Sequence, residues 1–227
     1  MRVHLFVCGL CLCVLSGCGG SSSSSSSTGN LRFVQASPDA PQSNLNVDGK
    51  LVSTGLGYGN ASGYISLNAG TRHVQVIPQS GASPILDLKV SIVSSGNQTL
   101  IETGKVANVQ SLLLTDTSSS TTTTTTTEGS VRVVNAALNI ASADVYLVAA
   151  GSSIAGISPV ATSLGINSDT GYELVPIGAY EVFMTAPGTK NVFLDTGAIN
   201  MTSNVHQTVI VLDGVSGGFT FTALTDQ

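Results

Sequence analysis

The chain has 227 residues, of which 42% are hydrophobic and only 9% are charged, and its formal net charge is −5. This length allows one large or two ordinary domains, each with its own apolar core. An acidic chain with scattered Lys and Arg lacks the basic surface that nucleic-acid binding requires, which argues against a nucleic-acid partner.

The first four residues carry one fixed positive charge, at Arg2, and an apolar run follows from Leu5 to Leu15. This run is too short to cross a bilayer as a helix, which takes about 20 residues, but it has the length of the hydrophobic region of a signal peptide. All four cysteines of the protein lie at or before Cys18. Residues 1–17 are therefore expected to be a signal peptide.

The signal ends in the sequence Leu15-Ser16-Gly17-Cys18. This resembles the bacterial lipoprotein box, which implies cleavage before Cys18 and lipidation of its thiol with acyl chains such as palmitate. Several acyl chains anchor a protein stably where one is marginal. Because Gly19 and not Asp follows, the resemblance implies an outer-membrane lipoprotein of the cell envelope. Cys8, Cys11 and Cys13 leave with the signal, so no disulfide is expected.

Two low-complexity runs divide the rest of the chain. A run of Gly and Ser follows the anchor and indicates a flexible tether at 18–29, and a Ser/Thr-rich run at 117–129 indicates a linker between domains. The predicted domains are therefore 30–116 and 130–227.

These two domains resemble each other. Short motifs recur in the same order, and the offset between equivalent residues grows from 100 to 110 along the chain. The pairs are Leu31–Ala36 with Val131–Ala136, Gly63-Tyr64 with Gly171-Tyr172, Gln98-Thr99 with Gln207-Thr208, and Leu114–Asp116 with Leu224–Asp226. The chain is therefore predicted to be a tandem repeat, with a longer loop in the second copy at Ala149–Thr170.

Each copy contains short β-prone segments separated by turn residues. In the stretch from Arg72 to Val76, Val74 and Val76 point to one face while His73 and Gln75 point to the other. The predicted strands are 31–36, 44–47, 63–67, 71–77, 86–92, 98–103 and 110–115, then 131–136, 144–148, 172–175, 179–185, 191–195, 205–212 and 219–225. This pattern predicts an all-β fold with two tandem immunoglobulin-like β-sandwich domains.

Several motifs of the first copy resemble one known family. They are Leu31–Pro41 (LRFVQASPDAP), Asn46–Gly49, Ala61–Tyr64, Asn68–Thr71 and Val74–Val76. They are similar to the domain of unknown function 4397 family, which occurs in bacterial envelope lipoproteins, often in tandem. The second copy departs from the family, since Ala137-Leu-Asn-Ile140 replaces Ser37-Pro-Asp-Ala40. The family has no known activity, so the resemblance implies fold and location and no mechanism.

Motifs that could carry chemistry are weak. Ser216 lies in a G-x-S-x-G pattern, but an alternating strand follows instead of a helix and no His comes after it, so a glycine-rich hairpin turn is expected. The glycines at 55, 57 and 59 are expected to form a loop or bulge, because no helix follows to bind phosphate. His73 and His206 occupy non-equivalent positions and are interpreted as surface or hydrogen-bonded strand residues.

Oxygen-bearing side chains occur in three turns, around Asp39, Asp48 and Asp169. Calcium binding is one reading, but Asp and Asn in turns also bond their own backbone, so no metal or other cofactor is expected. The chain has no Trp to stack on sugars, and Tyr64 and Tyr172 are expected to be structural because the repeat places them at equivalent positions.

The sequence therefore predicts a non-enzymatic protein, lipid-anchored at Cys18, that presents two β-sandwich modules for binding, adhesion or a structural role. Its expected partners are the membrane and an unidentified protein or glycan. The alternative is a small-molecule or glycan-binding accessory subunit of an envelope machine, with its specificity in the loop Ala149–Thr170. A hydrolase using Ser216 is the least favoured reading.

Overall fold

The computed structural model describes residues 27–81, 83–116 and 127–227. These residues form eighteen strands. The described part of the chain contains no helix that is long and apolar enough to span a membrane. The all-β prediction is therefore confirmed. The predicted signal peptide, Cys18 and nearly all of the two linkers lie outside the described residues.

The first repeat is a β-sandwich of two four-stranded sheets with the orders β4-β1-β7-β8 and β3-β2-β5-β6. Strand β1 runs parallel to β7, and the other pairs are antiparallel. The strands are β1 (Thr28–Gln35), β2 (Ser43–Val47), β3 (Lys50–Leu56), β4 (Ile65–Asn68), β5 (Gly70–Pro78), β6 (Leu86–Ile92), β7 (Asn97–Lys105) and β8 (Asn108–Asp116).

The second repeat has the same plan, with one sheet in the order β12-β9-β17-β18 and one in the order β11-β10-β14-β15. Strand β13 pairs with β9, and β16 pairs with β14. The strands are β9 (Glu128–Asn135), β10 (Ser142–Ala149), β11 (Ala161–Gly165), β12 (Ser168–Asp169), β13 (Glu173–Pro176), β14 (Gly178–Thr185), β15 (Val192–Asp195), β16 (Ile199–Met201), β17 (His206–Asp213) and β18 (Phe219–Asp226).

Each sandwich has its own apolar core between its two sheets. In β5, Val74 and Val76 are buried in the first core, while His73 and Gln75 point outward, as the alternation predicts. Leu31, Phe33 and Leu100 enter the same core from β1 and β7. The second core is built from the equivalent positions, including Val131 and Val133 of β9 and Val209 of β17.

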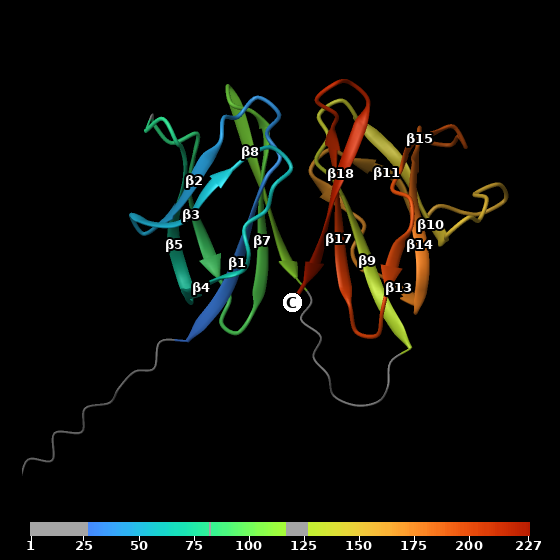
Figure 1. The fold of residues 1–227 in the computed structure, drawn as a ribbon, viewed down its shortest axis with the longest axis horizontal. Helices are drawn as coiled ribbons and strands as arrows, with labels where there is room; N and C mark the ends of the chain where they lie inside the picture. Colours follow the sequence, from blue (N-terminus) through green and yellow to red (C-terminus); the bar gives the residue numbers. More distant parts are fainter. Residues whose placement is uncertain (1–26, 82, 117–126) are drawn as a thin grey trace, which may run out of the picture.

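The four sheets stack as four layers, and the sheets that contain β1 and β9 are the two middle layers (Figure 1). Residues 31–35 of β1 and 129–135 of β9 are buried without interruption. A strand that is covered on both faces loses the alternation of apolar and polar residues. The side chains of β1 that face away from its own core therefore meet the other repeat.

The sequence prediction missed four strands, β3, β11, β12 and β16. Strands β3 and β11 lie at sheet edges with shifted register, and the other two have two and three residues, so each carries a weak periodic signal. Strands β1 and β9 begin at Thr28 and Glu128, which extends them into the segments expected to be linkers.

The inserted loop of the second repeat lies between β10 and β11, so the predicted loop Ala149–Thr170 is too long, because its second half contains β11 and β12. Its Ile154 is buried with Tyr146 and Val148 in a small cluster, and Phe183 packs against this cluster. The Lys190 ammonium lies 4.0 Å from the centroid of the Tyr146 ring. The loop therefore covers an apolar patch of the sheet that contains β10.

Candidate functional site

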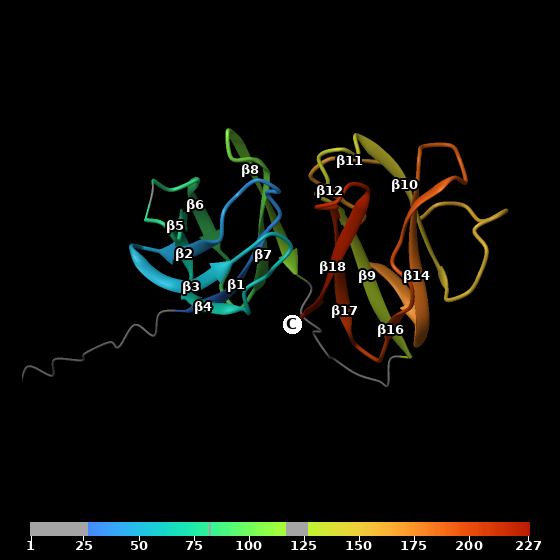
Figure 2. The ribbon, with the colours of Figure 1, turned by 45° about the horizontal axis from the view of Figure 1, so that its top comes forward.

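The two repeats meet through their middle sheets, so that β7 and β8 face β17 and β18 (Figure 2). An apolar cluster joins the repeats at the centre of this junction. Its buried members are Val34, Ala36, Ile101 and Leu114 from the first repeat and Val134, Ala136, Ile210 and Leu212 from the second. The chain therefore forms one packed unit, with the two sandwiches in direct contact.

Beside this apolar cluster, near the ends of β8 and β18, lies a buried polar network. The guanidinium of Arg32 donates two hydrogen bonds to the Thr99 hydroxyl, at 3.1 and 2.9 Å, within the first repeat. It then reaches across the junction and donates to the carboxylate of Asp226 and to the carbonyl of Thr225, the latter at 3.0 Å. Arg32 therefore connects the first repeat to the last strand of the second.

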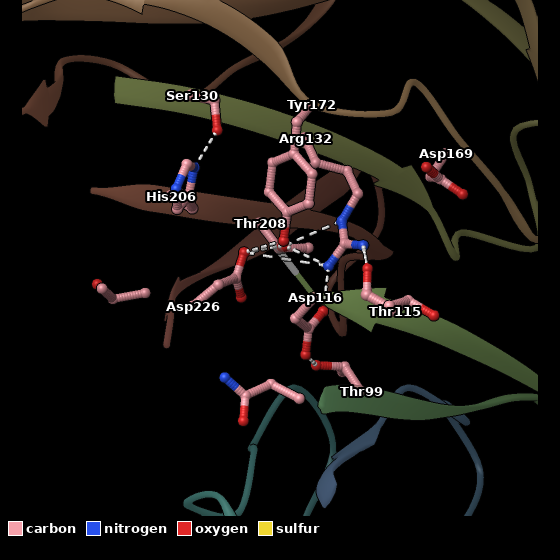
Figure 3. A network of polar contacts seen from close by, with 12 residues as sticks. Thr99, Thr115, Asp116, Ser130, Arg132, Asp169, Tyr172, His206, Thr208 and Asp226 are labelled. Atoms are coloured by element: carbon pink, nitrogen blue, oxygen red, sulfur yellow. Dashed lines mark hydrogen bonds and ion pairs between the residues drawn. The ribbon is translucent and has the colours of Figure 1, made fainter. Parts of the chain in front are cut away.

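The second repeat makes the reciprocal contacts, which Figure 3 shows around Arg132. Arg132 donates to Thr208 of its own repeat, at 3.1 and 2.8 Å. Across the junction it donates to Asp116 at 2.5 Å and to the carbonyl of Thr115 at 3.0 Å. The repeats thus exchange arginine–aspartate pairs around an approximate twofold axis.

Tyrosine and threonine hydroxyls complete the shell of each carboxylate. Tyr64 and Thr99 donate to Asp116 at 2.7 and 2.6 Å, and Tyr172 donates to Asp226 at 2.7 Å. Each arginine also lies about 4.5 Å from a tyrosine ring centroid within its own repeat. Burial, and the hydrogen bond to each carboxylate, raise the pKa values of Tyr64 and Tyr172 above the usual range.

The network contains two arginines and two aspartates, so it is electrically neutral, and every one of these side chains is nearly inaccessible to solvent. A buried ion pair contributes little net stability compared with apolar residues of the same shape, but the loss of one partner leaves an unpaired buried charge. The exchange therefore specifies how the two repeats are aligned.

The opposite end of the junction carries the β7–β8 and β17–β18 turns, and we call it the hairpin end. A cavity of about 340 Å³ lies there between the repeats, lined by Pro38, Tyr58 and Lys105 on one side and Leu138, Asn139 and Asp213 on the other. The Tyr58 hydroxyl donates to the carbonyl of Asp213 at 2.8 Å. Burial raises the pKa of Tyr58 to about 12, and the Asp213 charge adds to this effect.

An adjoining groove of about 510 Å³ follows strand β18. Residues 219–222 of β18 form one wall, and Tyr58, Gly59 and Asn60 of the first repeat form another. The Thr222 hydroxyl donates to the carbonyl of Gly59 at 2.7 Å, which fixes the two walls together. This groove, with the neighbouring cavity, is the candidate binding site of the molecule.

The loop at 37–40 and its counterpart at 137–140 each form hydrogen bonds to the hairpin of their own repeat, β7–β8 or β17–β18. In the first repeat, the Asp39 carboxylate accepts from the Val106 N–H at 2.9 Å. In the second, the roles of donor and acceptor are reversed, because Asp213 of the hairpin accepts from the N–H groups of Leu138 and Asn139. The sequence departure in the second copy therefore preserves the contact by other means.

Ser216, His73 and His206, which the sequence analysis considered as catalytic or binding residues, lie apart in a turn and in two strands. Ser216 lies in the β17–β18 turn, which is closed by a hydrogen bond from the Gly214 N–H to the Gly218 carbonyl, so the predicted hairpin turn is confirmed. His206 contacts Ser130 at 2.5 Å, and His73 contacts Asp87 at 2.7 Å. The structure brings neither histidine together with Ser216 in a hydrogen bond among the described residues.

The three acidic turns are engaged with protein groups. Asp48 accepts from the N–H of His73 and from Arg72, and these contacts hold the pKa of Asp48 below its usual value. Asp169 accepts from the N–H of Gly171, two residues later, which is the backbone bond expected of Asp in a turn. Across residues 27–81, 83–116 and 127–227, no group of three or more His, Cys, Asp or Glu could hold a metal ion.

Sequence reasoning missed Glu102 of β7. Its carboxyl group is fully buried, and neither oxygen has a hydrogen-bond partner. Burial alone raises its pKa to about 7. Because side chains alternate between the two faces of a strand, Glu102 lies on the same face of β7 as Leu100, which is part of the first core. The offset of 109 residues between the repeats in this region aligns Glu102 with the apolar Val211, and this mismatch is the signal that could have identified Glu102.

The reasoning also missed the arginine–aspartate exchange. Arg32 and Arg132 recur at equivalent positions, as do Asp116 and Asp226. Charged residues that recur at equivalent positions of two divergent repeats were the available signal. No pattern within one repeat shows that its arginine pairs with the aspartate of the other.

These features define a tandem-repeat β-sandwich protein whose two halves share one buried junction. The model of the DUF4397 family, a domain of unknown function, matches residues 29–146. Since this match covers more than half of the chain, the protein belongs to the DUF4397 family, as the sequence motifs predicted. The match begins in β1, spans the first sandwich and extends into β10 of the second.

Two solved structures show a distant likeness. The TIE protein of Bacillus anthracis has a TM-score of 0.27 and 13% identity over 82% of this chain, which spans only 34% of that protein. A product complex of the multi-modular glycogen-degrading pneumococcal virulence factor SpuA has a TM-score of 0.24 and 10% identity, over 88% of this chain and 22% of that one. No curated protein matches the chain.

Proposed function

We propose that this protein is a non-enzymatic, lipid-anchored protein of the cell envelope that presents a rigid pair of β-sandwiches for binding. The observation that carries the proposal is the geometry of the described unit. Strand β1 begins at the end of the junction opposite the hairpin end (Figure 1), and the residues that line the candidate groove lie at the hairpin end. A lipid on Cys18 would therefore attach to the unit at the end opposite the groove.

The chain between the anchor and the fold is short. Eight residues lie between Cys18 and the first described residue, Ser27, and a chain of that length spans at most about 30 Å. Acylation of Cys18 would therefore keep the sandwiches close to the bilayer. The outer membrane is the proposed location, because Gly19 follows the cysteine.

The binding role is supported by how the junction is built. The buried exchange of charges fixes the relative position of the two repeats, so both walls of the groove are held before any partner arrives. A preformed site avoids the free-energy cost of ordering loops on binding. The inserted loop of the second repeat, by contrast, uses Ile154 to cover its own sheet.

Metabolic labelling with radioactive palmitate tests the anchor. The intact protein and a Cys13→Ser variant are expected to incorporate label into the envelope fraction, because Cys13 is removed with the signal. A Cys18→Ser variant is expected to lose the label and to leave the membrane fraction. Labelling that persists in the Cys18→Ser variant would reject the lipid anchor.

A further inference from the structure

The outer strands of the four sheets differ in how well they are protected against pairing with another chain. Edge strands are commonly protected by shortness, by charge or by register shifts. Strand β3 has register shifts, β6 carries Asp87 and Lys89, and β11 and β15 are short. Strands β8 and β18 have nine and eight residues, unbroken register and no charge before their last residue.

Three contacts show which backbone groups of β18 point away from its sheet. The Gly214 N–H donates to the Gly218 carbonyl, the Val211 carbonyl accepts from the N–H of Ala136, which directly follows β9, and the Thr225 carbonyl accepts from Arg32. Because Val211 lies opposite Phe221, these contacts indicate that the backbone groups of the odd-numbered residues of β18 point away from β17. The N–H and C=O groups of Phe219, Phe221 and Ala223 therefore point outward, and within the described residues only β17 pairs with this strand.

The outer edge of β18 coincides with the candidate groove. Phe219 and Phe221 line it, whereas the cleft beside β8 is lined by Asn108 and Gln110, whose backbone groups pair inward with β7. The groove is continuous with the junction of the repeats, because Gly59 forms a wall and bonds Thr222. None of the residues that line the groove carries a charged side chain.

We propose that the groove binds an extended, uncharged polypeptide segment of a partner protein, which adds to the free edge of β18 as an additional antiparallel strand of its sheet. Strand addition draws its affinity from main-chain hydrogen bonds and its specificity from alternate side chains. The edge offers the hydroxyl groups of Thr220 and Thr222 and the half-buried rings of Phe219 and Phe221, which pack against the second core, and it carries no charge before Asp226. The partner segment therefore alternates apolar and hydroxyl-bearing residues.

This inference names the partner class of the proposed binding role and rests on it, but its test in solution is independent of the lipid anchor. The probe is a soluble synthetic peptide of alternating valine and threonine with a lysine at each end, added to the folded protein. The readout is amide hydrogen exchange, resolved by residue. Peptide addition is expected to slow exchange at Phe219, Phe221 and Ala223, while Thr220 and Thr222, already bonded to β17, exchange slowly throughout.

Matched controls separate strand addition from nonspecific contact. The same peptide with N-methylated amides on its pairing edge keeps its side chains but cannot donate, and it is expected to bind at least tenfold more weakly. Ala223→Pro removes one outward donor and is expected to weaken binding similarly, whereas Ala223→Val keeps the donor and the binding. The proposal is overturned if the peptide protects no outward amide, if both peptides bind equally, or if the edge instead pairs with a second copy of the chain.

Discussion

Arg32 donates a hydrogen bond to the carboxylate of Asp226, which lies 194 residues later in the chain, and both side chains are buried. The equivalent residues of the other half, Arg132 and Asp116, form the reciprocal pair. Each repeat therefore depends on its partner to neutralise a buried charge. This mutual dependence aligns the two sandwiches and holds the walls of the groove together.

Arg32→Ala is expected to lower the free energy of unfolding by about 3–5 kcal/mol, because it leaves Asp226 buried without a positive partner. Removing both Arg32 and Asp226 should cost less than the sum of the two single changes. Urea denaturation of the four proteins of this double-mutant cycle measures the coupling. Arg72→Ala is the control: its partner Asp48 is exposed, so the unfolding midpoint should hardly move. Strict additivity of the Arg32 and Asp226 changes would contradict the exchange.

Glu102 should make the stability of the first sandwich fall as pH rises. Its carboxyl group ionises from about pH 4.5 in the unfolded chain, but its pKa in the fold is about 7. Between these values the unfolded state binds fewer protons, so stability decreases, by about 3 kcal/mol once both values are passed. Urea midpoints at pH 5 and pH 8 measure this change.

Glu102→Val gives the first repeat the residue of the second, Val211, and is the matched test of that pH dependence. The variant is expected to lose most of the difference between pH 5 and pH 8 and to be more stable than the natural chain at pH 8. An unchanged pH profile in the variant would show that other groups cause it.

Gly59 has a φ of +76°, and a Cβ there would lie 3.4 Å from Leu212 of the second repeat. Gly59→Ala is expected to destabilise the protein by about 1–2 kcal/mol, because a side chain is strained in this left-handed conformation. Gly57→Ala is the control, since Gly57 does not have a positive φ and its Cβ would make only ordinary contacts. Thermal melts of the two variants provide the comparison, and equal melting temperatures would disagree with this account.

The inserted loop gives a further prediction. Ile154→Ala is expected to cost about 2 kcal/mol, because Ile154 is buried against Tyr146 and Val148. Ile157, in the same loop, is 45% exposed, so Ile157→Ala should change stability little. Chemical denaturation distinguishes the two. Equal, small effects would mean that the loop does not cover the sheet in solution.

The sequence predicts the features of this fold that depend on local pattern. Alternation in β5 identified its buried face at Val74 and Val76, and glycine-rich turns placed the hairpin around Ser216. The internal offsets located the insertion within Ala149–Thr170, and the structure narrows it to the loop between β10 and β11. Each of these depends on residues that are close together in the chain, where periodicity and turn chemistry are informative.

What the sequence did not predict depends on contacts between the repeats. Both faces of β1 are buried because the face that points away from its own core packs against the other sandwich. The sequence of one strand does not show that a second domain will cover it. Tyr64 and Tyr172 were expected to be structural from their equivalent positions, but their partners, Asp116 and Asp226, become visible only in the folded chain. The open edge of β18 likewise depends on which strand ends the sheet.

Cleavage of the linker tests most directly whether the junction, and not the connecting chain, unites the two repeats. A recognition sequence for a site-specific protease replaces residues within 117–126, and the cut protein is analysed by size-exclusion chromatography with light scattering. The two halves are expected to elute together at the mass of the intact chain and to separate when Arg32 and Arg132 are both replaced by alanine. Separation of two folded halves from the otherwise natural sequence would contradict the shared junction.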